Sequence, residues 1–385
     1  MTTGPLSGVR VTELATIGPP SFAGMMLADL GADVVRVDRV GARSSFPGPA
    51  RRELLHRGKR AVSLDLKNPL GREAFLAQVG RSDILIEGFA PGTAERLGVG
   101  PEDCTAMNPR LVYCRLTGWG QDGPWSRHNG QDINVLAATG VLGAIGEPGR
   151  PPQIPLDLVG DFAGGSLYMV VGALAALHEA QRSGRGQVID AAAVDGTSHL
   201  MTFLYSALAI GSWTDQRGVN LIDGAAPFYR TYETSDGGTL AVGALDQHGY
   251  ARLLAVLELD LPVTEQHRQE RWPATTEQFA QQFRARTLDD WMSRCDGSEC
   301  ITPVVGMTAA GEHPHLAARQ TLVVRDEVLQ PAPAPRFSRS AAELDSCPPE
   351  PGAHTAEVLS ELGFSPATLV KASAAATNDT TIDAN

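Results

Sequence analysis

The sequence contains little that marks a secreted, membrane-spanning or zinc-binding protein. Its five cysteines are odd in number and form no C-x-x-C pair, which argues against a disulfide framework and a metal site. No apolar run approaches the roughly 20 residues that a bilayer-spanning helix needs. Residues 1–10 lack the basic and apolar segments of a signal peptide. We therefore expect a cytoplasmic protein with reduced thiols and no bound metal.

An excess of basic residues is also missing. The chain has 44 acidic and 32 basic residues, so its formal net charge is −12, whereas nucleic-acid-binding proteins usually present a basic surface. We expect no nucleic-acid partner, and a polyanionic ligand would have to meet a local cluster of basic side chains. The length of 385 residues predicts two domains, or one large domain with an insertion.

The first third of the chain alternates short apolar strands with helical segments. Such alternation predicts an α/β fold, a large Rossmann-like domain in which helices cover both faces of a mostly parallel sheet. The expected strands cover residues 9–14, 33–38, 61–66, 83–86 and 111–116. The turn after the first strand reads Ala15-Thr16-Ile17-Gly18-Pro19-Pro20 and lacks G-x-G-x-x-G. Because that pattern lets a pyrophosphate approach the helix start, a nicotinamide cofactor is disfavoured.

The character of the sequence changes in its second half. Asp236-Gly237-Gly238 separates two β-prone runs and predicts a hairpin within a smaller α+β domain. Prolines alternate along 331–335 and favour an extended linker. We expect a large domain over 1–212, a linker over 213–227, the small domain over 228–313, a return to the large domain over 314–370, and a disordered tail over 371–385.

One carboxylate stands at the expected start of a long helix. Asp161 follows Leu158-Val159-Gly160 and precedes two glycines and an apolar run. An aspartate there favours an N-cap, since its oxygen accepts free N–H groups of the first turn. Those N–H groups and the helix dipole can also stabilise an oxyanion, and the glycines let a ligand approach the backbone. Asp161 is therefore either a helix cap, or a base or nucleophile beside an oxyanion site.

Several blocks of sequence together carry a family resemblance. The blocks are residues 4–11 (GPLSGVRV), 27–38 (LADLGADVVRVD), 57–60 (RGKR), 64–67 (LDLK), 87–92 (EGFAPG), 95–98 (ERLG), 160–161 (GD) and 184–187 (GRGQ). From about residue 4 to about residue 339 the chain resembles the family III CoA-transferases, and most closely their racemase branch. Residues 241–246 (AVGALD) lack the run of glycines found in many of the transferases.

The resemblance implies an architecture and a substrate. Members of this family are interlocked homodimers, in which the large domain of one subunit and the small domain of its partner form the active site. Coenzyme A is part of their substrate rather than a tightly bound cofactor, and its phosphates need cationic side chains. By position, Arg39, Lys59 and Arg96 would contact the nucleotide and phosphates, and Phe89 would lie near the adenine. The alternative for each is a solvated surface residue.

The resemblance also implies a proton-transfer site, with departures from the family pattern. Racemases remove the proton next to a thioester carbonyl with one acid/base group and return it from another. In the racemases, one of these groups is the aspartate that matches Asp161, and the other is a histidine that a glutamate supports. Here Gln131 replaces the histidine and cannot exchange a proton at neutral pH, and Asp246 replaces the glutamate. Asp157 stands where racemases tend to have asparagine.

Four functions remain open. The first is a racemase-like enzyme that moves the α-proton of a 2-methylacyl-CoA or a related acyl thioester through Asp161, with His128 or His248 as candidates for the second base. The second is a CoA transferase in which Asp161 is the nucleophile and which needs no histidine. The third is a biosynthetic isomerase or cyclase, and the fourth an inactive acyl-CoA-binding protein. We expect the first.

Overall fold

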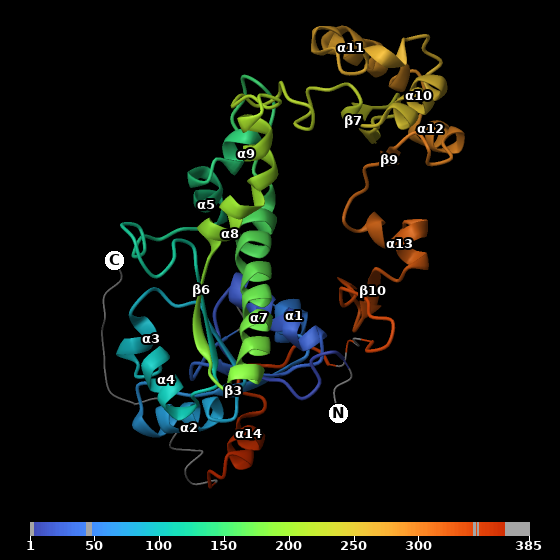
Figure 1. Cartoon of the computed structure of the whole chain (residues 1–385). Coiled ribbons are helices and arrows are strands. Elements are labelled where there is room, and N and C mark those ends of the chain that lie inside the picture. The colour runs from blue at the N-terminus through green and yellow to red at the C-terminus, as the bar shows by residue number, and fades with distance from the viewer. Residues whose placement is uncertain (1–3, 44–47, 342–343, 345, 366–385) are drawn as a thin grey trace. The chain divides into compact units, whose positions relative to one another are not determined.

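The computed structural model describes residues 4–43, 48–341, 344 and 346–365, and the chain divides into two compact units (Figure 1). Unit 1 comprises Met1–Ala138, Leu156–Leu200 and Arg319–Asn385, and unit 2 comprises Thr139–Pro155 and Met201–Ala318. The division differs from the expected boundaries because residues 139–155, 201–227 and 314–318 group with the smaller unit. The expected tail at 371–385 lies outside the described residues.

Unit 1 is built on a parallel sheet. Its strands are β1 (Arg10–Leu14), β2 (Asp33–Asp38), β3 (Lys59–Ser63), β4 (Ile84–Glu87), β5 (Val112–Thr117) and β6 (Gln187–Ala192). Within the described residues they form one six-stranded sheet of order β3-β2-β1-β4-β5-β6, and every neighbouring pair is parallel. This is the strand order of doubly wound dinucleotide-binding folds. The expected α/β class with a parallel sheet is confirmed.

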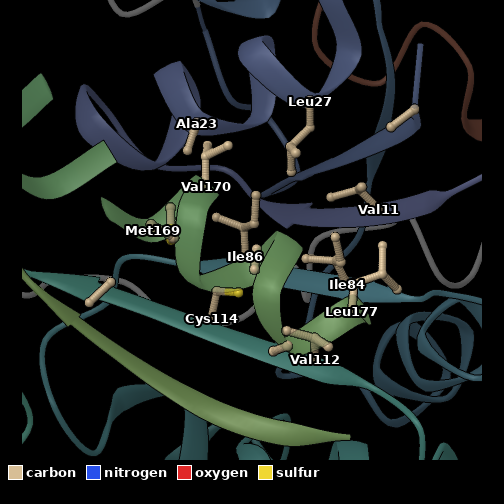
Figure 2. Close-up of a cluster of buried hydrophobic side chains, with 14 of the residues drawn as sticks. Val11, Ala23, Leu27, Ile84, Ile86, Val112, Cys114, Met169, Val170 and Leu177 are labelled. Atoms are coloured by element: carbon tan, nitrogen blue, oxygen red, sulfur yellow. The ribbon is translucent and has the colours of Figure 1, made fainter. Parts of the chain in front are cut away.

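Helices bury both faces of this sheet. They are α1 (Pro19–Asp29), α2 (Pro69–Val79), α3 (Thr93–Arg96), α4 (Pro101–Met107), α7 (Tyr168–Ser183) and α14 (Thr355–Glu361). Two further helices, α5 (Asp132–Ala138) and α8 (Ala193–Leu200), pack on residues 159–167 before α7. Ile84 and Ile86 pack with α1 and α7 in one core (Figure 2). Leu85 packs with α2 and α14 in the other. Strands that are buried on both faces explain the nearly continuous apolar runs.

Local signals fix several boundaries in unit 1. The Asn68 side chain accepts a hydrogen bond from the Leu70 N–H at 3.0 Å and Pro69 opens α2, as the sequence predicts. Strand β3 begins at Lys59, two residues before the expected start, because Lys59 pairs with Val34 of β2. A short hairpin of β10 (Leu322–Arg325) and β11 (Val328–Pro331) completes the unit.

Unit 2 is a smaller α+β body. Its elements are α6 (Val141–Ala144), α9 (Thr202–Ala209), β7 (Tyr229–Glu233), β8 (Thr239–Gly243), α10 (Gln247–Val256), α11 (Trp272–Phe283), α12 (Leu288–Arg294), β9 (Ile301–Pro303) and α13 (Pro314–Ala318). Strands β7 and β8 pair antiparallel on either side of Asp236-Gly237-Gly238, which confirms the expected hairpin. Their apolar face packs on α10, α11 and α12 through aromatic residues such as Phe283 and Trp291.

The segment expected as a linker between domains is a hydrogen-bonded loop of unit 2. Asp223 accepts the N–H groups of Gly218 at 2.7 Å and Asn220 at 3.0 Å. The buried Asn220 side chain in turn donates to the carbonyl of Gln216 at 2.8 Å. The loop and strands β7 and β8 line a cavity of about 1380 Å³. The hydrogen bonds of Asp223 and Asn220 therefore fold this loop back on itself.

One helical stretch, Leu156–Ser183, is long and apolar enough to cross a membrane by length and composition alone. No such stretch was expected from the apolar runs of the sequence. Its Met169, Val170 and Ala173 are buried in the core that α1 and the sheet share, as Figure 2 shows for the first two. Because the core helix of a soluble protein passes the same test, this feature is weak support for a membrane span.

Candidate active site

The strand order of unit 1 marks one edge of the sheet as a ligand site. Strands β1 and β4 are neighbours, and the chain leaves them in opposite directions, to β2 and to β5. Ligands of open α/β sheets bind outside the carboxyl ends of the strands at such a switch point. The two following loops meet there, since a Cβ on Gly88 would lie 2.5 Å from Pro20 and 3.3 Å from the Thr16 hydroxyl.

A π-helical segment, η4 (Val159–Leu167), packs against α1, the helix that follows β1. The Ser166 hydroxyl lies 2.8 Å from the carbonyl oxygen of Pro19 and 3.1 Å from that of Asp161. The rings of Phe22 and Phe162 lie 4.8 Å apart. Segments of π-helix are rare and occur often at functional sites. These contacts hold the backbone of Asp161 against the start of α1, at the carboxyl edge of the sheet.

Gly164, the first of the two glycines after Asp161, serves helix packing. A Cβ on Gly164 would lie 2.2 Å from the Thr197 hydroxyl of α8, and a Cβ on Gly196 would lie 1.9 Å from the Gly164 carbonyl oxygen. Only glycine allows η4 and α8 to approach this closely. Gly164 is therefore needed for the contact between these two helical segments, whereas a Cβ on Gly165 would lie 3.5 Å or more from its neighbours.

Asp161 is not a helix cap, contrary to one of the two expectations. It lies inside η4, whose start has no side-chain cap from Leu158. Its own backbone N–H donates instead to Oδ2 of Asp132, at 2.8 Å, and the Gly160 N–H also donates to Asp132. A carboxylate of this chain thus accepts these two N–H groups, so the expected oxyanion site would need other N–H groups of the helix start. The Asp161 side chain remains available for chemistry.

The environment of Asp161 favours its protonated form. Burial raises the pKa of Asp161 to about 6, and the charges of Asp132 and Asp157 add to the increase. Burial also raises the pKa of Asp132, which is 2% exposed, whereas Asp157 lies exposed in the short helix η3 (Leu156–Leu158). A carboxyl group that titrates near neutral pH can both remove and return a proton.

Gln131 and His128, two residues that bear on the expected second base, precede α5. Gln131 is exposed immediately before α5, and its backbone N–H donates to the Asn134 side chain at 3.0 Å. The ring of His128 is also exposed and stacks on Trp125, with ring centroids 5.9 Å apart. Sequence reasoning missed Asp132, which follows Gln131 directly. Its position at the first residue of a helix was the available signal.

The comparisons with known proteins agree with this geometry. The sequence pattern named CoA-transferase family III matches residues 6–355. The chain belongs to this family. It is 44% identical over 365 residues to an alpha-methylacyl-CoA racemase of Mus musculus and 42% identical over 367 residues to one of Homo sapiens, covering 94% of each chain in both pairs. A CaiB/BaiF family protein from Brucella suis matches its fold with a TM-score of 0.79 at 28% identity, over 94% of this chain and 100% of that one.

Three of the four residues expected to bind coenzyme A in this family III member lie at the carboxyl edge. Arg39 is exposed directly after β2, and Phe89 is half-buried directly after β4. Arg96 is exposed in α3, where its guanidinium donates to the Thr93 hydroxyl at 2.8 Å. Both arginines can thus reach a polyanion at this edge.

Lys59, the fourth residue, is placed differently from the expectation. Its side chain is fully buried and donates to Glu13 at 2.7 Å and to the Ser21 carbonyl at 2.9 Å. A phosphate contact would require this ion pair to break, which is costly because an unpaired Glu13 charge would remain in the core. The burial therefore favours a structural role for Lys59.

A buried ion-pair network, which the sequence did not reveal, holds the loop that carries Phe89 and Arg96. Glu87 accepts the Phe89 N–H at 2.6 Å and the Arg115 Nε–H at 2.7 Å. The same guanidinium donates to Glu95 at 2.8 Å. Since charge-assisted hydrogen bonds of this kind fix geometry strongly, the loop after β4 is preorganised.

Asp246 belongs to unit 2 and begins α10. Its Oδ1 accepts the Gly249 N–H at 2.8 Å, and this hydrogen bond is the main reason why the pKa of Asp246 is lowered. Its carboxylate is thus an ionised helix cap. His248 lies exposed in the first turn of the same helix. Within the described residues, no group of three or more His, Cys, Asp or Glu could hold a metal.

Proposed function

We propose that the chain is a racemase-type isomerase that moves the α-proton of a 2-methylacyl-CoA or a related acyl thioester. The observation that carries the proposal is the carboxyl group of Asp161. It is half-buried, its pKa is raised to about 6, and its segment is bound to the carboxyl edge of the sheet through Ser166. The 42–44% identity to two alpha-methylacyl-CoA racemases supports the same reaction.

In the proposed reaction, the ionised Asp161 removes the proton next to the thioester carbonyl, which forms an enolate, and then returns a proton to the same carbon. Gln131 cannot supply the proton at neutral pH. Isomerisation requires the proton to return to the opposite face, so a second acid must act from that side, because Asp161 alone would exchange the proton with retention and leave the configuration unchanged. Arg39 and Arg96 bind the phosphates, and Phe89 contacts the adenine. Coenzyme A is a part of the substrate, with no tightly bound cofactor.

The decisive experiment follows deuterium and chirality together. The protein is incubated in D₂O with one enantiomer of a 2-methylacyl-CoA, with Asp161→Asn as the control. We expect deuterium at the α-carbon in the wild type only. Exchange with inversion identifies a second base and supports the isomerase, whereas exchange with retention shows that Asp161 works alone and contradicts isomerisation of that substrate. An absence of exchange across 2-methylacyl-CoA substrates would contradict the proposal.

A second candidate is a family III CoA transferase, and Gln131 is the observation that favours it. In this reaction the Asp161 carboxylate attacks the thioester carbonyl and releases the CoA thiolate, which leaves a mixed anhydride. The thiolate then attacks the Asp161 carbonyl, which forms an aspartyl-CoA thioester and frees the carboxylic acid. No histidine is needed. Hydroxylamine trapping followed by mass spectrometry of the Asp161 peptide would detect the thioester.

We also propose that the protein works in the cytoplasm as a homodimer whose active site combines the two subunits. No residue of α9 is buried, and Phe203, Tyr205 and Leu208 are 69%, 57% and 42% exposed. An apolar patch of this kind marks a protein contact. Light scattering should give about twice the chain mass of 40.7 kDa. A dimer co-expressed from one Asp161→Asn chain and one Asp246→Asn chain should keep about half of the wild-type activity, because one of its two sites carries neither change.

A further inference from the structure

Asp132 has a side chain that the proposed reaction does not yet use. It is 2% exposed and begins α5 beneath η4. Its Oδ2 accepts the backbone N–H of Asp161 at 2.8 Å, across 29 residues of chain. Its other oxygen, Oδ1, is buried with no hydrogen-bond partner in the described part of the chain. Since an unpaired carboxylate oxygen in the interior is costly, this arrangement needs a reason.

We propose that Asp132 is a positioning residue: its Oδ2 holds the backbone of η4 at Asp161, and its buried charge makes Asp161 a stronger base. The proposal rests on the proposed function of Asp161 in proton transfer. It adds a residue that acts through Asp161 and does not touch the substrate.

The backbone at Gly160 supports the positioning role. A Cβ at Gly160 would lie 2.6 Å from Asp132 Oδ2 and 3.3 Å from the Asp132 carbonyl oxygen. Any side chain at residue 160 would therefore displace the carboxylate. The Gly160 N–H also donates to Asp132. The consecutive N–H groups of Gly160 and Asp161, with no side chain at residue 160, thus form a binding site that fits one carboxylate.

The charges around Asp161 support the electrostatic role. Of the neighbouring charges that raise its pKa, Asp132 ranks before Asp157, and burial keeps the Asp132 charge poorly screened. The other elements packed against η4 bring groups that have partners of their own. The Tyr168 hydroxyl of α7 lies 2.7 Å from a ring nitrogen of His199 of α8. Asp190 of β6 accepts the Gln121 N–H. Arg115 of β5 pairs with Glu87, and Asp29 of α1 pairs with Arg57. Asp195 of α8 is exposed.

The test compares the titration of Asp161 in charge-removing variants. The carboxyl carbons of aspartate are labelled with ¹³C, and the Asp161 signal is identified by its loss in Asp161→Asn. In Asp132→Asn we expect the titration midpoint of Asp161 to move about one pH unit lower, which is a tenfold change in proton affinity. The acid limb of the pH profile of kcat/KM for proton exchange should move by the same amount. Asp157→Asn should produce a smaller decrease. The exposed Asp122→Asn is the matched control and should leave both unchanged.

A second variant separates positioning from folding. Gly160→Ala keeps every carboxylate, and alanine is the better helix former, but its Cβ must move the Asp132 carboxylate. We expect a lower Asp161 midpoint and slower exchange in this variant, while Gly143→Ala, whose Cβ meets nothing within 4 Å, behaves as the wild type. A titration of Asp161 that stays unchanged in both Asp132→Asn and Gly160→Ala overturns the proposal, even where activity falls. The NMR titration decides the question even if the wild type shows no exchange and the proposed function fails.

Discussion

The ammonium group of Lys59 lies 2.7 Å from Oε2 of Glu13, and both side chains are fully buried. The pair joins β1 to β3 across the intervening β2. Gly24 of α1 makes room for it, because a Cβ there would lie 1.8 Å from the Glu13 oxygen and 3.0 Å from Lys59 Nζ. A basic residue within a family sequence block thus serves the core of unit 1, and it begins β3 at the amino end of the strand, whereas Arg39 and Phe89 follow the carboxyl ends of β2 and β4.

Lys59→Met should destabilise the protein by about 3–5 kcal/mol, because it leaves the Glu13 charge buried without its partner. The double variant Glu13→Leu/Lys59→Met should recover most of this loss, since neither charge then remains. Chemical denaturation measures both. If Lys59 does not contact coenzyme A, the double variant binds CoA as tightly as the wild type. A large loss of CoA affinity in a stable double variant would restore the phosphate role.

Arg39→Gln and Arg96→Gln should each weaken CoA binding about tenfold to a hundredfold, since a hydrogen bond to a charged group contributes about 1.5–3 kcal/mol. The loss should shrink at high salt, because screening weakens exposed charge pairs. Both side chains are exposed, so stability should change little. Calorimetry with CoA measures the affinity. Arg110→Gln is the matched control, because Arg110 is exposed at the amino end of β5.

Asp161→Asn should reduce α-proton exchange at least about a hundredfold, because the amide cannot take a proton from the substrate. The fold should persist, since the Asp161 backbone N–H still donates to Asp132 in the variant. Circular dichroism and CoA binding check the fold, and deuterium incorporation measures the exchange. Full activity in Asp161→Asn would remove Asp161 from the mechanism in both the racemase and the transferase reactions.

The raised pKa of Asp161 also predicts how stability depends on pH. The folded protein holds the Asp161 proton up to a pKa of about 6, above the usual value for an unfolded chain, near 3.9. The stability from this proton is therefore fully present below pH of about 4 and is lost as the pH rises through about 6. Asp161→Asn should then have a higher Tm than the wild type at pH 7.5 and an equal Tm at pH 4. A lower Tm of the variant at pH 7.5 would contradict the raised pKa.

Gln131→His should create or increase racemisation if the segment before α5 still faces the substrate. A histidine there can donate the proton that Gln131 cannot, from a second position. The readout is inversion at the α-carbon during exchange in D₂O. His128→Gln is the companion variant, because it removes the nearest alternative histidine in the sequence. An unchanged stereochemical course in Gln131→His would show that the pocket has diverged from the racemase geometry.

The parts of the fold that follow local rules could be predicted closely. The strand at 33–38 and the helix at 69–79 coincide with β2 and α2, because apolar runs, a cap and a proline act within a few residues. Helices α8 and α9, by contrast, lie in one apolar stretch and are separated only at Met201, where no proline marks the break. The interior of the linker segment was not predictable either, since the hydrogen bonds of Asp223 form only when the loop closes on itself.

The candidate site, like the fold, could be predicted from the sequence only in part. The sequence identified Asp161, and the placement of Arg39, Phe89 and Arg96 after the expected strands. It did not reveal the partner of the N–H groups at Asp161, because the group that accepts them comes from 29 residues earlier in the chain. Lys59 was assigned to a phosphate for a similar reason, since the burial of a lysine depends on a carboxylate 46 residues away.

The sequence by itself determined the α/β class and the family and singled out the carboxylate proposed to carry the chemistry, because each depends on residues that are close together or in short blocks. Only the tertiary structure decided what surrounds that carboxylate. Packing brings Asp132 under η4, buries it, and raises the pKa of Asp161 to about 6. Proton affinity depends on burial and on charges distant in the chain, and neither exists before the chain folds.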